Sequence, residues 1–249
     1  MLLAIDAGNS NIKIALFDGS ELLAKARLTT DVARTADEYH KEIRELFEFK
    51  GLDAIVISSV VPALNSTFTC IAETYFGSKP LFVDHTTAGL KIVYDRPADL
   101  GADRIADAVA GIAKYGAPCI VVDFGTATTF NVVNAAAEFI GGAISPGLMT
   151  CSEALFSRTA KLPRVKFERP DKAIASSTVA AIQSGLYYGY AGLVDGVLGQ
   201  IISELRAIPR VIATGGLAHS VAPASRYIQH VDDTLTLEGL RVVYERMKN

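Results

Sequence analysis

Two short stretches of the chain repeat one pattern of residues that could bind phosphate. Each runs from an apolar segment through an aspartate to a turn with a glycine, and then through polar residues to a second apolar segment. The aspartate and the glycine are Asp6 and Gly8 in the first stretch, and Asp123 and Gly125 in the second. Glycine lets the backbone approach an anion closely, and the N–H groups of such a turn form an anion-binding concavity. The pattern predicts two β-hairpins whose turns receive phosphate.

The polar side chains of these stretches suit the same chemistry. The first turn supplies Asn9, Ser10 and Asn11, and the second supplies Thr126; all are neutral hydrogen-bond donors. An aspartate at the end of a buried strand can hold a metal ion that bridges phosphates. One stretch alone is more typical of an ordinary hairpin with an Asx turn. Two copies half a chain apart favour the functional interpretation, and they predict two like lobes with a nucleotide between them.

A third group of polar residues lies between the two stretches. The apolar periodicity stops over residues 86–100, and this polar loop carries Tyr94 at a place where a substrate site is expected. Residues 100–104 then begin a helix whose first turn contains Asp103 and Arg104, and a helix N-terminus favours negative charge nearby. Spacing alone leaves two interpretations open. The pair binds substrate, or the aspartate caps the helix and the arginine is solvent-exposed.

Composition limits the classes of protein that fit. A chain of 249 residues is long enough for two lobes. The net charge of −3, without a basic cluster, makes nucleic acid an unexpected partner. A mean hydropathy of +0.28 with half of the residues apolar indicates a further buried surface, such as a dimer interface, yet no apolar run is long enough to span a membrane.

The cysteines and the first residues bear on location. Cys70, Cys119 and Cys151 are scattered in apolar surroundings, which predicts reduced core thiols and not a disulfide framework. The first six residues form an apolar strand that ends in an acid, unlike a signal peptide. We therefore expect a cytoplasmic protein.

The elements that must position these residues alternate between strands and helices. In the first half, strands are predicted over residues 2–5, 12–17, 21–28, 53–58 and 81–83. Thr35 with Glu38 forms a capping box for the first helix, and Pro62 opens the second as a proline in the first helical position. This order resembles half of the two-lobed actin-like, Hsp70 and sugar-kinase ATPase fold. The fold class implied is α/β, with duplicated ribonuclease-H-like lobes and mixed sheets, divided as 1–115 and 116–249.

The second half follows a similar order. Strands are predicted over residues 119–123, 128–133, 138–140 and 210–213, and helices over 147–157, 179–205 and 236–248. Ser177 and Thr178 cap the long helix, in which glycine recurs at 185, 189, 192, 196 and 199. Glycine costs about 1 kcal/mol against alanine inside a helix. So many glycines predict close helix–helix approach, within the lobe or across a dimer axis. The turn at 214–218 is a natural place for an adenosine.

Other common catalytic motifs are absent from the sequence. It contains no P-loop, no dinucleotide-binding glycine fingerprint after a strand and no serine-nucleophile elbow. The four histidines lack metal-ligand spacing with the cysteines, so a zinc site is not expected.

Taken together, these motifs resemble the type III pantothenate kinases in order along nearly the whole chain. The matching segments are residues 6–13, 101–104, 123–128, 141–147, 160–163, 178–185 and 214–216. The hairpin pair with the Gly-x-Asp-Arg segment is the most specific part. The resemblance implies the actin-like fold, a homodimer, and phosphorylation of pantothenate by ATP at the first step of coenzyme A synthesis. It also implies a divalent metal such as Mg²⁺ and a monovalent cation, potassium (K⁺) or ammonium (NH₄⁺).

The same resemblance assigns roles to individual residues. The ATP-phosphate loop would consist of Asp6, Ala7, Gly8, Asn9, Ser10, Asn11, Ile12 and Lys13, with Asp6 near the divalent metal. Thr126 would contact phosphate, and Asp123 would bind the monovalent cation. Pantothenate would be held by Tyr94, Gly101, Ala102, Asp103 and Arg104, with Thr178 closing the site. Asp103 would be the general base, and Arg104 would bind the substrate carboxylate as a bidentate fork. One departure is that residues 175–177 read Ala-Ser-Ser where the family often has Gly-Lys.

Two other classes of function fit less well. A non-catalytic ATP-binding regulator on this fold would not need the three acids Asp6, Asp103 and Asp123. An actin-fold phosphatase or acyl-phosphate enzyme is disfavoured because Tyr94 and the Gly-Ala-Asp-Arg segment favour an alcohol substrate.

Overall fold

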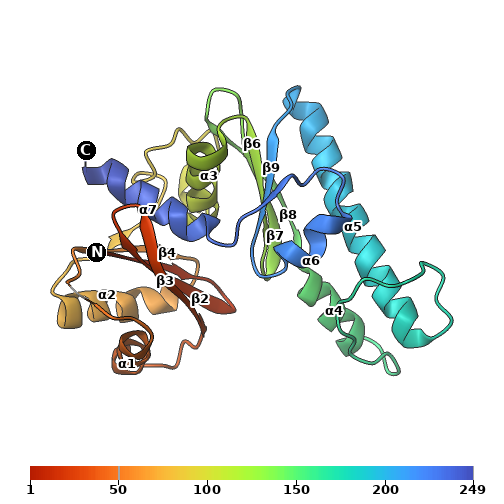
Figure 1. Ribbon diagram of the computed structural model, residues 1–249, viewed down its shortest axis with the longest axis horizontal. Helices are drawn as coiled ribbons and strands as arrows, with labels where there is room; N and C mark the ends of the chain where they lie inside the picture. Colours follow the sequence, from red (N-terminus) through yellow and green to blue (C-terminus); the bar gives the residue numbers. More distant parts are fainter. Residues whose placement is uncertain (50, 249) are drawn as a thin grey trace. The chain divides into compact units, whose positions relative to one another are not determined.

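The computed structural model describes residues 1–49 and 51–248 (Figure 1). Its contacts divide the chain into two compact units. The first contains residues 1–114 together with the C-terminal residues from 234 onward, and the second contains residues 115–233. Each unit is built on one five-stranded mixed sheet.

The sheet of the first unit has the strand order β3-β2-β1-β4-β5. The central strand β1 pairs antiparallel with β2 and parallel with β4. A short hairpin joins the antiparallel pair, and the parallel pair needs the longer connection through β3 and the first helix. The strands are β1 (Leu2–Ala7), β2 (Asn11–Asp18), β3 (Glu21–Thr29), β4 (Ala54–Ser59) and β5 (Leu81–Phe82).

Helices cover both faces of this sheet. Leu3 and Ile5 point to the face covered by α1 (Ala36–Leu46) and α2 (Pro62–Phe76), where Tyr39 and Phe68 complete the core. The other face is packed against α7 (Leu235–Lys248), which contacts β1, β4 and β2. A side chain at Gly239 of α7 would overlap the backbone of Ala106 in α3 (Ala102–Tyr115), so α7 also packs closely on α3.

The position of α7 differs from the predicted division into lobes at 1–115 and 116–249. The last helix belongs with the first unit because its apolar face completes that unit's sheet. A buried hydrogen bond of 2.8 Å from Thr236 Oγ1 to Asp107 Oδ1 adds to this packing. The order of the elements along the chain suggested that α7 belongs to the second lobe. Its contacts with β1, β2 and β4 place it in the first unit.

The second unit repeats the topology of the first. Its sheet has the order β10-β9-β6-β7-β8, so β6, β7, β8, β9 and β10 occupy the places of β1, β2, β3, β4 and β5. The strands are β6 (Cys119–Phe124), β7 (Ala127–Val133), β8 (Phe139–Pro146), β9 (Arg210–Thr214) and β10 (His230–Val231). The helices are α4 (Leu148–Ser157), α5 (Thr178–Leu205) and the short α6 (Ala218–Val221). The expected duplication is therefore present in the strand pairing itself.

Strand β8 runs further than the predicted 138–140. Gly141 and Gly142, with φ of 117° and 148°, stay in register with Val132 and Asn131 of β7, and the strand continues to Pro146. Glycine in a strand interior weakens the local signal, but pairing with β7 keeps the segment extended.

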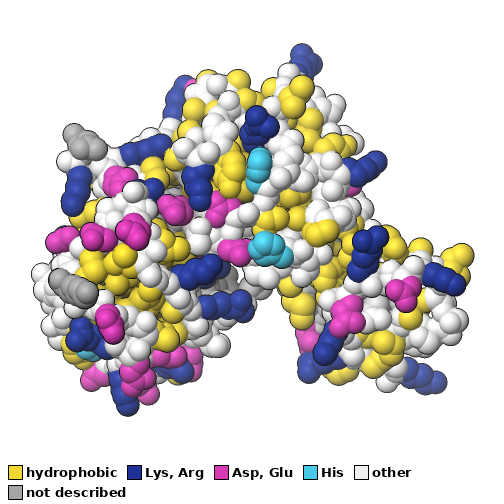
Figure 2. All heavy atoms as spheres, viewed as in Figure 1, with side chains coloured by type: hydrophobic (Ala, Val, Ile, Leu, Met, Phe, Trp, Pro, Cys, Tyr) yellow, Lys and Arg dark blue, Asp and Glu magenta, His cyan; other side chains and the backbone are white. Residues whose placement is uncertain are grey.

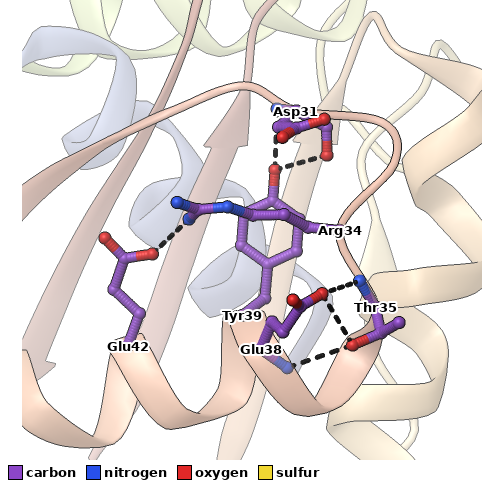
Figure 3. Close-up of polar contacts among 6 residues, drawn as sticks. All are labelled: Asp31, Arg34, Thr35, Glu38, Tyr39 and Glu42. Carbon is purple, nitrogen blue, oxygen red and sulfur yellow. Dashed lines mark hydrogen bonds and ion pairs between the residues drawn. The ribbon is translucent and has the colours of Figure 1, made fainter.

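The connection from β3 to α1 is held by side chains from the helix (Figure 3). The predicted capping box is present: the Thr35 hydroxyl accepts from Glu38 N–H, and the Glu38 carboxylate accepts from Thr35 N–H at 2.8 Å. The buried Tyr39 hydroxyl bonds both the N–H and the carbonyl of Asp31 at 2.9 Å. Arg34 lies over the Tyr39 ring and pairs with Glu42. The residues after β3 are thus fixed to α1.

The cysteines correct one expectation. All three are free, but only Cys119 lies in the core, where burial raises the pKa of its thiol to about 12. Cys70 is exposed on α2 and Cys151 is half-buried on α4, because each lies on an outward part of its helix.

The surface carries charges of both signs. On the face drawn in Figure 2, Lys and Arg side chains are interspersed with Asp and Glu side chains. Among the residues described, no helix is both long and apolar enough to cross a membrane.

Candidate active site

The first hairpin turn joins β1 to β2 through Gly8, Asn9 and Ser10, and Asn11 is the first residue of β2. Gly8 N–H donates to Asn11 O at 3.0 Å, and a Cβ at Gly8 would lie 3.0 Å from the same oxygen. Asn9 and Ser10 are exposed at the tip. A glycine is needed where the two sides of the turn come this close, and the tip leaves polar groups accessible to an anion.

Asp6 lies at the carboxyl end of β1, directly below this turn, and is 6% exposed. Its strand partners are Lys13 on β2 and Ser58 on β4, so the three side chains share one face of the sheet. Lys13 Nζ lies 3.5 Å from Asp6 Oδ2. The Ser58 hydroxyl is completely buried and has no hydrogen-bond partner among the described residues. A buried carboxylate beside an unsatisfied hydroxyl is a set of oxygen donors that suits a hydrated cation.

The second hairpin turn, between β6 and β7, is one residue shorter. Gly125 N–H donates to Ala127 O at 3.0 Å, and Gly125 and Thr126 are exposed. Asp123 pairs with Thr129 as Asp6 pairs with Lys13. Asp6 thus faces the ammonium group of Lys13, whereas Asp123 faces the hydroxyl of Thr129.

Asp123 is half-buried and surrounded by close backbone. Its parallel partner on β9 is Thr214, and a side chain at Gly215 would overlap both Asp123 Oδ1 and the backbone of Phe124. Gly215 also has φ of +92°, a backbone conformation that favours glycine. The turn after β9 therefore needs glycine at 215 both for space and for its backbone conformation. The predicted adenosine turn thus lies against the second aspartate.

The N-terminus of α4 closes on the second turn. Gly147 N–H donates to Thr126 O at 3.1 Å, and Thr150 Oγ1 donates to the same oxygen at 2.8 Å. A side chain at Gly147 would overlap the carbonyl oxygens of Gly125 and Thr126. Two donors at the start of α4 thus fix the Thr126 carbonyl, and with it the second turn.

Tyr190 of α5 supports this arrangement and was missed by the sequence analysis. Its buried hydroxyl is hydrogen-bonded to the hydroxyl of Thr128 on β7. Burial raises the pKa of Tyr190. This phenol therefore joins α5 to the strand that follows the second turn. In the sequence Tyr190 is simply one aromatic residue on the apolar side of a helix.

The segment Gly101–Arg104 lies at the carboxyl end of β4 in the first unit. A Cβ at Gly101 would lie 3.7 Å from Val60 Cγ1, and Val60 N–H donates to Ala7 O at 3.1 Å. This segment and the first turn are therefore at the same edge of one sheet. Ala102 is buried at the start of α3.

Asp103 folds back over Gly101. Its Oδ1 accepts from Arg104 N–H at 2.8 Å, and a Cβ at Gly101 would come within 2.5 Å of that oxygen. Arg104 is 7% exposed, so the interpretation of a solvent-exposed arginine is wrong. Asp103 does accept a hydrogen bond from a backbone N–H at the helix N-terminus. The geometry is therefore compatible with a capping role and with a chemical role for this carboxylate.

Tyr94 and Thr178 are the remaining predicted residues. Tyr94 is 37% exposed in the segment before the short helix η1 (Pro97–Asp99). Thr178 is the exposed first residue of α5, whose N-cap is Ser177. It borders a groove of about 600 Å³ between α4 and α5, lined mainly by apolar side chains such as Leu155 and Ile182. Tyr94 belongs to the first unit with Asp6 and Asp103, and Thr178 belongs to the second with Asp123 and Thr126.

Comparisons with known proteins agree on one family. The family model described as type III pantothenate kinase matches residues 2–200. A type III pantothenate kinase of Geobacter sulfurreducens is 51% identical over 99% of this chain and 99% of its own length. One from Solibacter usitatus is 49% identical over 99% of this chain and 97% of its own.

Solved structures support the actin-like fold. A Campylobacter jejuni protein described as a Baf family transcriptional activator matches with a TM-score of 0.64 at 20% identity, over 99% of each chain. The ROK hexokinase of Thermus thermophilus matches with a TM-score of 0.51 at 12% identity, again over 99% of each chain. At these identities the likeness extends to the fold alone.

The Tyr190–Thr128 pair generates a stability prediction. Tyr190→Phe leaves the buried Thr128 hydroxyl without this partner, and we expect it to lower the free energy of unfolding by about 1–3 kcal/mol. Thr128→Val should cost a similar amount. The double variant should cost less than the sum, because no hydroxyl is then left unpaired between the two positions. Urea unfolding of the four proteins measures the coupling, and strictly additive losses would contradict it.

Proposed function

The chain belongs to the type III pantothenate kinase family, and we propose which of its residues carry the reaction. The enzyme transfers the γ-phosphate of ATP to pantothenate and forms 4'-phosphopantothenate, the first step of coenzyme A biosynthesis. Phosphoryl transfer needs in-line placement, charge neutralisation and a group that orients the attacking hydroxyl. The observation that carries the assignment of residues is the juxtaposition of the first turn with the Gly101–Arg104 segment at one sheet edge.

ATP phosphates are proposed to bind at the two hairpin turns. In the first, Gly8 to Asn11 present backbone and side-chain donors, while Ala7, Ile12 and Lys13 are the flanking strand residues, with Lys13 supplying positive charge. In the second, the exposed Thr126 supplies a hydroxyl. Donors held by strand pairing need little reorganisation when the charged phosphates arrive.

Asp6 is the proposed ligand of Mg²⁺. The described residues contain no group of three His, Cys, Asp or Glu side chains arranged for a metal ion. This agrees with Mg²⁺, which is commonly held by one or two carboxylates, water and substrate phosphates. The buried Asp6 carboxylate and the unsatisfied Ser58 hydroxyl fit that donor set. When bound, the ion supplies charge neutralisation at the phosphates.

Asp123 is the proposed ligand of a monovalent cation. Its carboxylate lies near the end of β6, and the Phe124 carbonyl oxygen beside it is the ligand type that potassium prefers. Thr129, opposite Asp123, brings no competing positive charge. The second turn thus fits a large monovalent cation better than the first.

Pantothenate is proposed to bind at the edge formed by Gly101, Ala102, Asp103 and Arg104, with Tyr94 as a further contact. Thr178 of the second unit stays a proposed substrate contact through the family resemblance alone. Arg104 would pair with the substrate carboxylate as a bidentate fork. Asp103 would accept the proton of the attacking hydroxyl while that oxygen bonds to the γ-phosphorus. Gly101 leaves the space into which the Asp103 carboxylate folds.

We also propose a homodimer joined through α5, in a cytoplasmic protein. Gly185, Gly189, Gly192 and Gly196 are exposed, and no heavy atom lies within 4 Å of a Cβ placed on any of them. Only Gly199 meets a neighbour, the Tyr227 hydroxyl at 3.2 Å. Close approach within the unit therefore does not explain the first four glycines, and close approach of a second copy does. Three free cysteines support the cytoplasmic location.

Asp103→Asn separates the base from the helix cap. Asparagine keeps an oxygen that can accept from Arg104 N–H but cannot take the substrate proton. We expect turnover to fall by about 10²–10⁴-fold, while ATP binding and thermal stability stay close to those of the unaltered protein. A coupled assay of pantothenate-dependent ADP release measures the loss. Asp99→Asn, which removes an exposed acid from the preceding turn, is the control. Early melting with normal turnover per folded molecule would mean that Asp103 is only a cap.

Potassium dependence tests the role of Asp123. With saturating ATP and pantothenate, replacing potassium by sodium should cause a large loss of turnover, and ammonium should restore it. Asp123→Asn should remove most of the potassium response, since the charged ligand is gone. Equal rates of the unaltered protein in sodium and potassium would exclude this site while leaving the fold unaffected.

Gly189→Leu tests the dimer without a clash inside the chain. Because the space around Gly189 is open, leucine fits the isolated chain, but it would separate two helices packed at their backbones. Light scattering at micromolar concentration should show a dimer for the unaltered protein and a shift towards monomer for the variant. Glu45→Leu adds the same side chain to the exposed surface of α1 and should leave the mass unchanged. A monomer mass for the unaltered protein would exclude the dimer.

A further inference from the structure

Four polar side chains form a row across the sheet of the first unit, just below the first turn. Asp6 pairs with Lys13 and with Ser58, and Lys13 pairs in turn with Arg27 of β3. Residues paired in register point to the same face of a sheet, with neighbouring strands about 4.8 Å apart. The row therefore reads hydroxyl, carboxylate, ammonium, guanidinium from β4 to β3.

Arg27 is attached to the turn by one corner of its guanidinium. Its Nε donates to Asn11 Oδ1 at 2.8 Å, and the side chain is exposed. No ion pair joins Arg27 to an acid among residues 1–49 and 51–248. An arginine has five N–H donors, so the terminal nitrogens keep their capacity to bind an anion. Lys13, by contrast, already lies 3.5 Å from the Asp6 carboxylate.

The end of β3 is fixed against the turn by further bonds. Thr30 Oγ1 donates to Gly8 O at 2.6 Å, and Thr30 N–H donates to Ser10 O at 3.2 Å. The next residue, Asp31, is held on both sides by the buried hydroxyl of Tyr39 (Figure 3). Arg27 therefore extends from a backbone that cannot easily move away from the turn. A guanidinium held in this way loses less rotational freedom on binding an anion.

We propose that Arg27 is a further phosphate-binding residue, which contacts a phosphate oxygen of the nucleotide at the first turn through its terminal guanidinium nitrogens. The inference rests on the proposed nucleotide site. ATP carries several negative charges, whereas the protein has a net charge of −3 and Lys13 is partly neutralised by Asp6. A second cation beside the turn offsets this unfavourable balance.

Arg27→Gln is the test, because glutamine keeps a donor for Asn11 but removes the charge. Affinities for Mg²⁺-ATP and for adenosine are measured by competition with a fluorescent ATP analogue, in the absence of pantothenate. We expect ATP to bind about 10–100-fold more weakly and adenosine to bind as before. The loss should shrink as salt concentration rises. Arg27→Lys, which keeps the charge but not the fork, should recover part of the affinity.

Lys25→Gln is the matched control. Lys25 is an exposed cation on the same face of β3 as Arg27. It pairs with Ala15 and not with Lys13, so it lies two residues further from the turn than Arg27. It should leave both affinities unchanged. Unchanged ATP affinity in Arg27→Gln, or equal losses for ATP, adenosine and the Lys25 control, would overturn the proposal. Pantothenate-dependent ADP release by the unaltered protein is a separate test of the proposed function, which can fail while ATP binding and the Arg27 result stand.

Discussion

Strand register decides where the two aspartates of this protein stand. In each unit the central strand pairs antiparallel with the next strand and parallel with the fourth, and this places Asp6 and Asp123 one residue pair from a tight turn. A slip by one residue would turn either carboxylate to the opposite face and an apolar side chain to the turn. Such a slip would bury the carboxylate among the apolar side chains that pack on the opposite face, which is costly for an unpaired charge. The hydrophobic core thus sets the position of the polar chemistry.

The two turns differ although their topology is the same. The first is longer, its aspartate is more deeply buried, and that aspartate faces Lys13 and the unsatisfied Ser58 hydroxyl. In the second, the equivalent neighbours are Thr129 and Thr214, and the N-terminus of α4 covers the turn. Duplication therefore supplied two similar scaffolds, and a few substitutions at paired positions gave each a different electrostatic character. The first turn has the cations Lys13 and Arg27 beside it, and the second has the hydroxyls of Thr129 and Thr214 beside its aspartate.

Much of this could be read from the sequence, for local reasons. The capping box of Thr35 and Glu38, Pro62 at the start of α2 and the glycines of both turns act within a few residues, so their patterns survive in a single sequence. The burial of Arg104, the role of Tyr190 and the attachment of Arg27 to Asn11 depend on residues that are distant in sequence. The same holds for α7, whose amphipathic pattern predicts a helix but not the sheet that it covers. Strand β8 was underestimated because its glycines contribute no side-chain signal, although the backbone pairing continues through them.

The return of α7 to the first unit has a consequence for biosynthesis. Residues 115–233 form a compact unit that interrupts the first one, so the helix that covers one face of the first sheet is translated after the second unit. While the ribosome is making the second unit, apolar residues of β1 and β4 on that face lack their cover. The second unit is complete earlier and can fold as the nascent chain emerges. Chaperones that bind exposed apolar strands would therefore have their longest opportunity at the N-terminal segment, although it leaves the ribosome first.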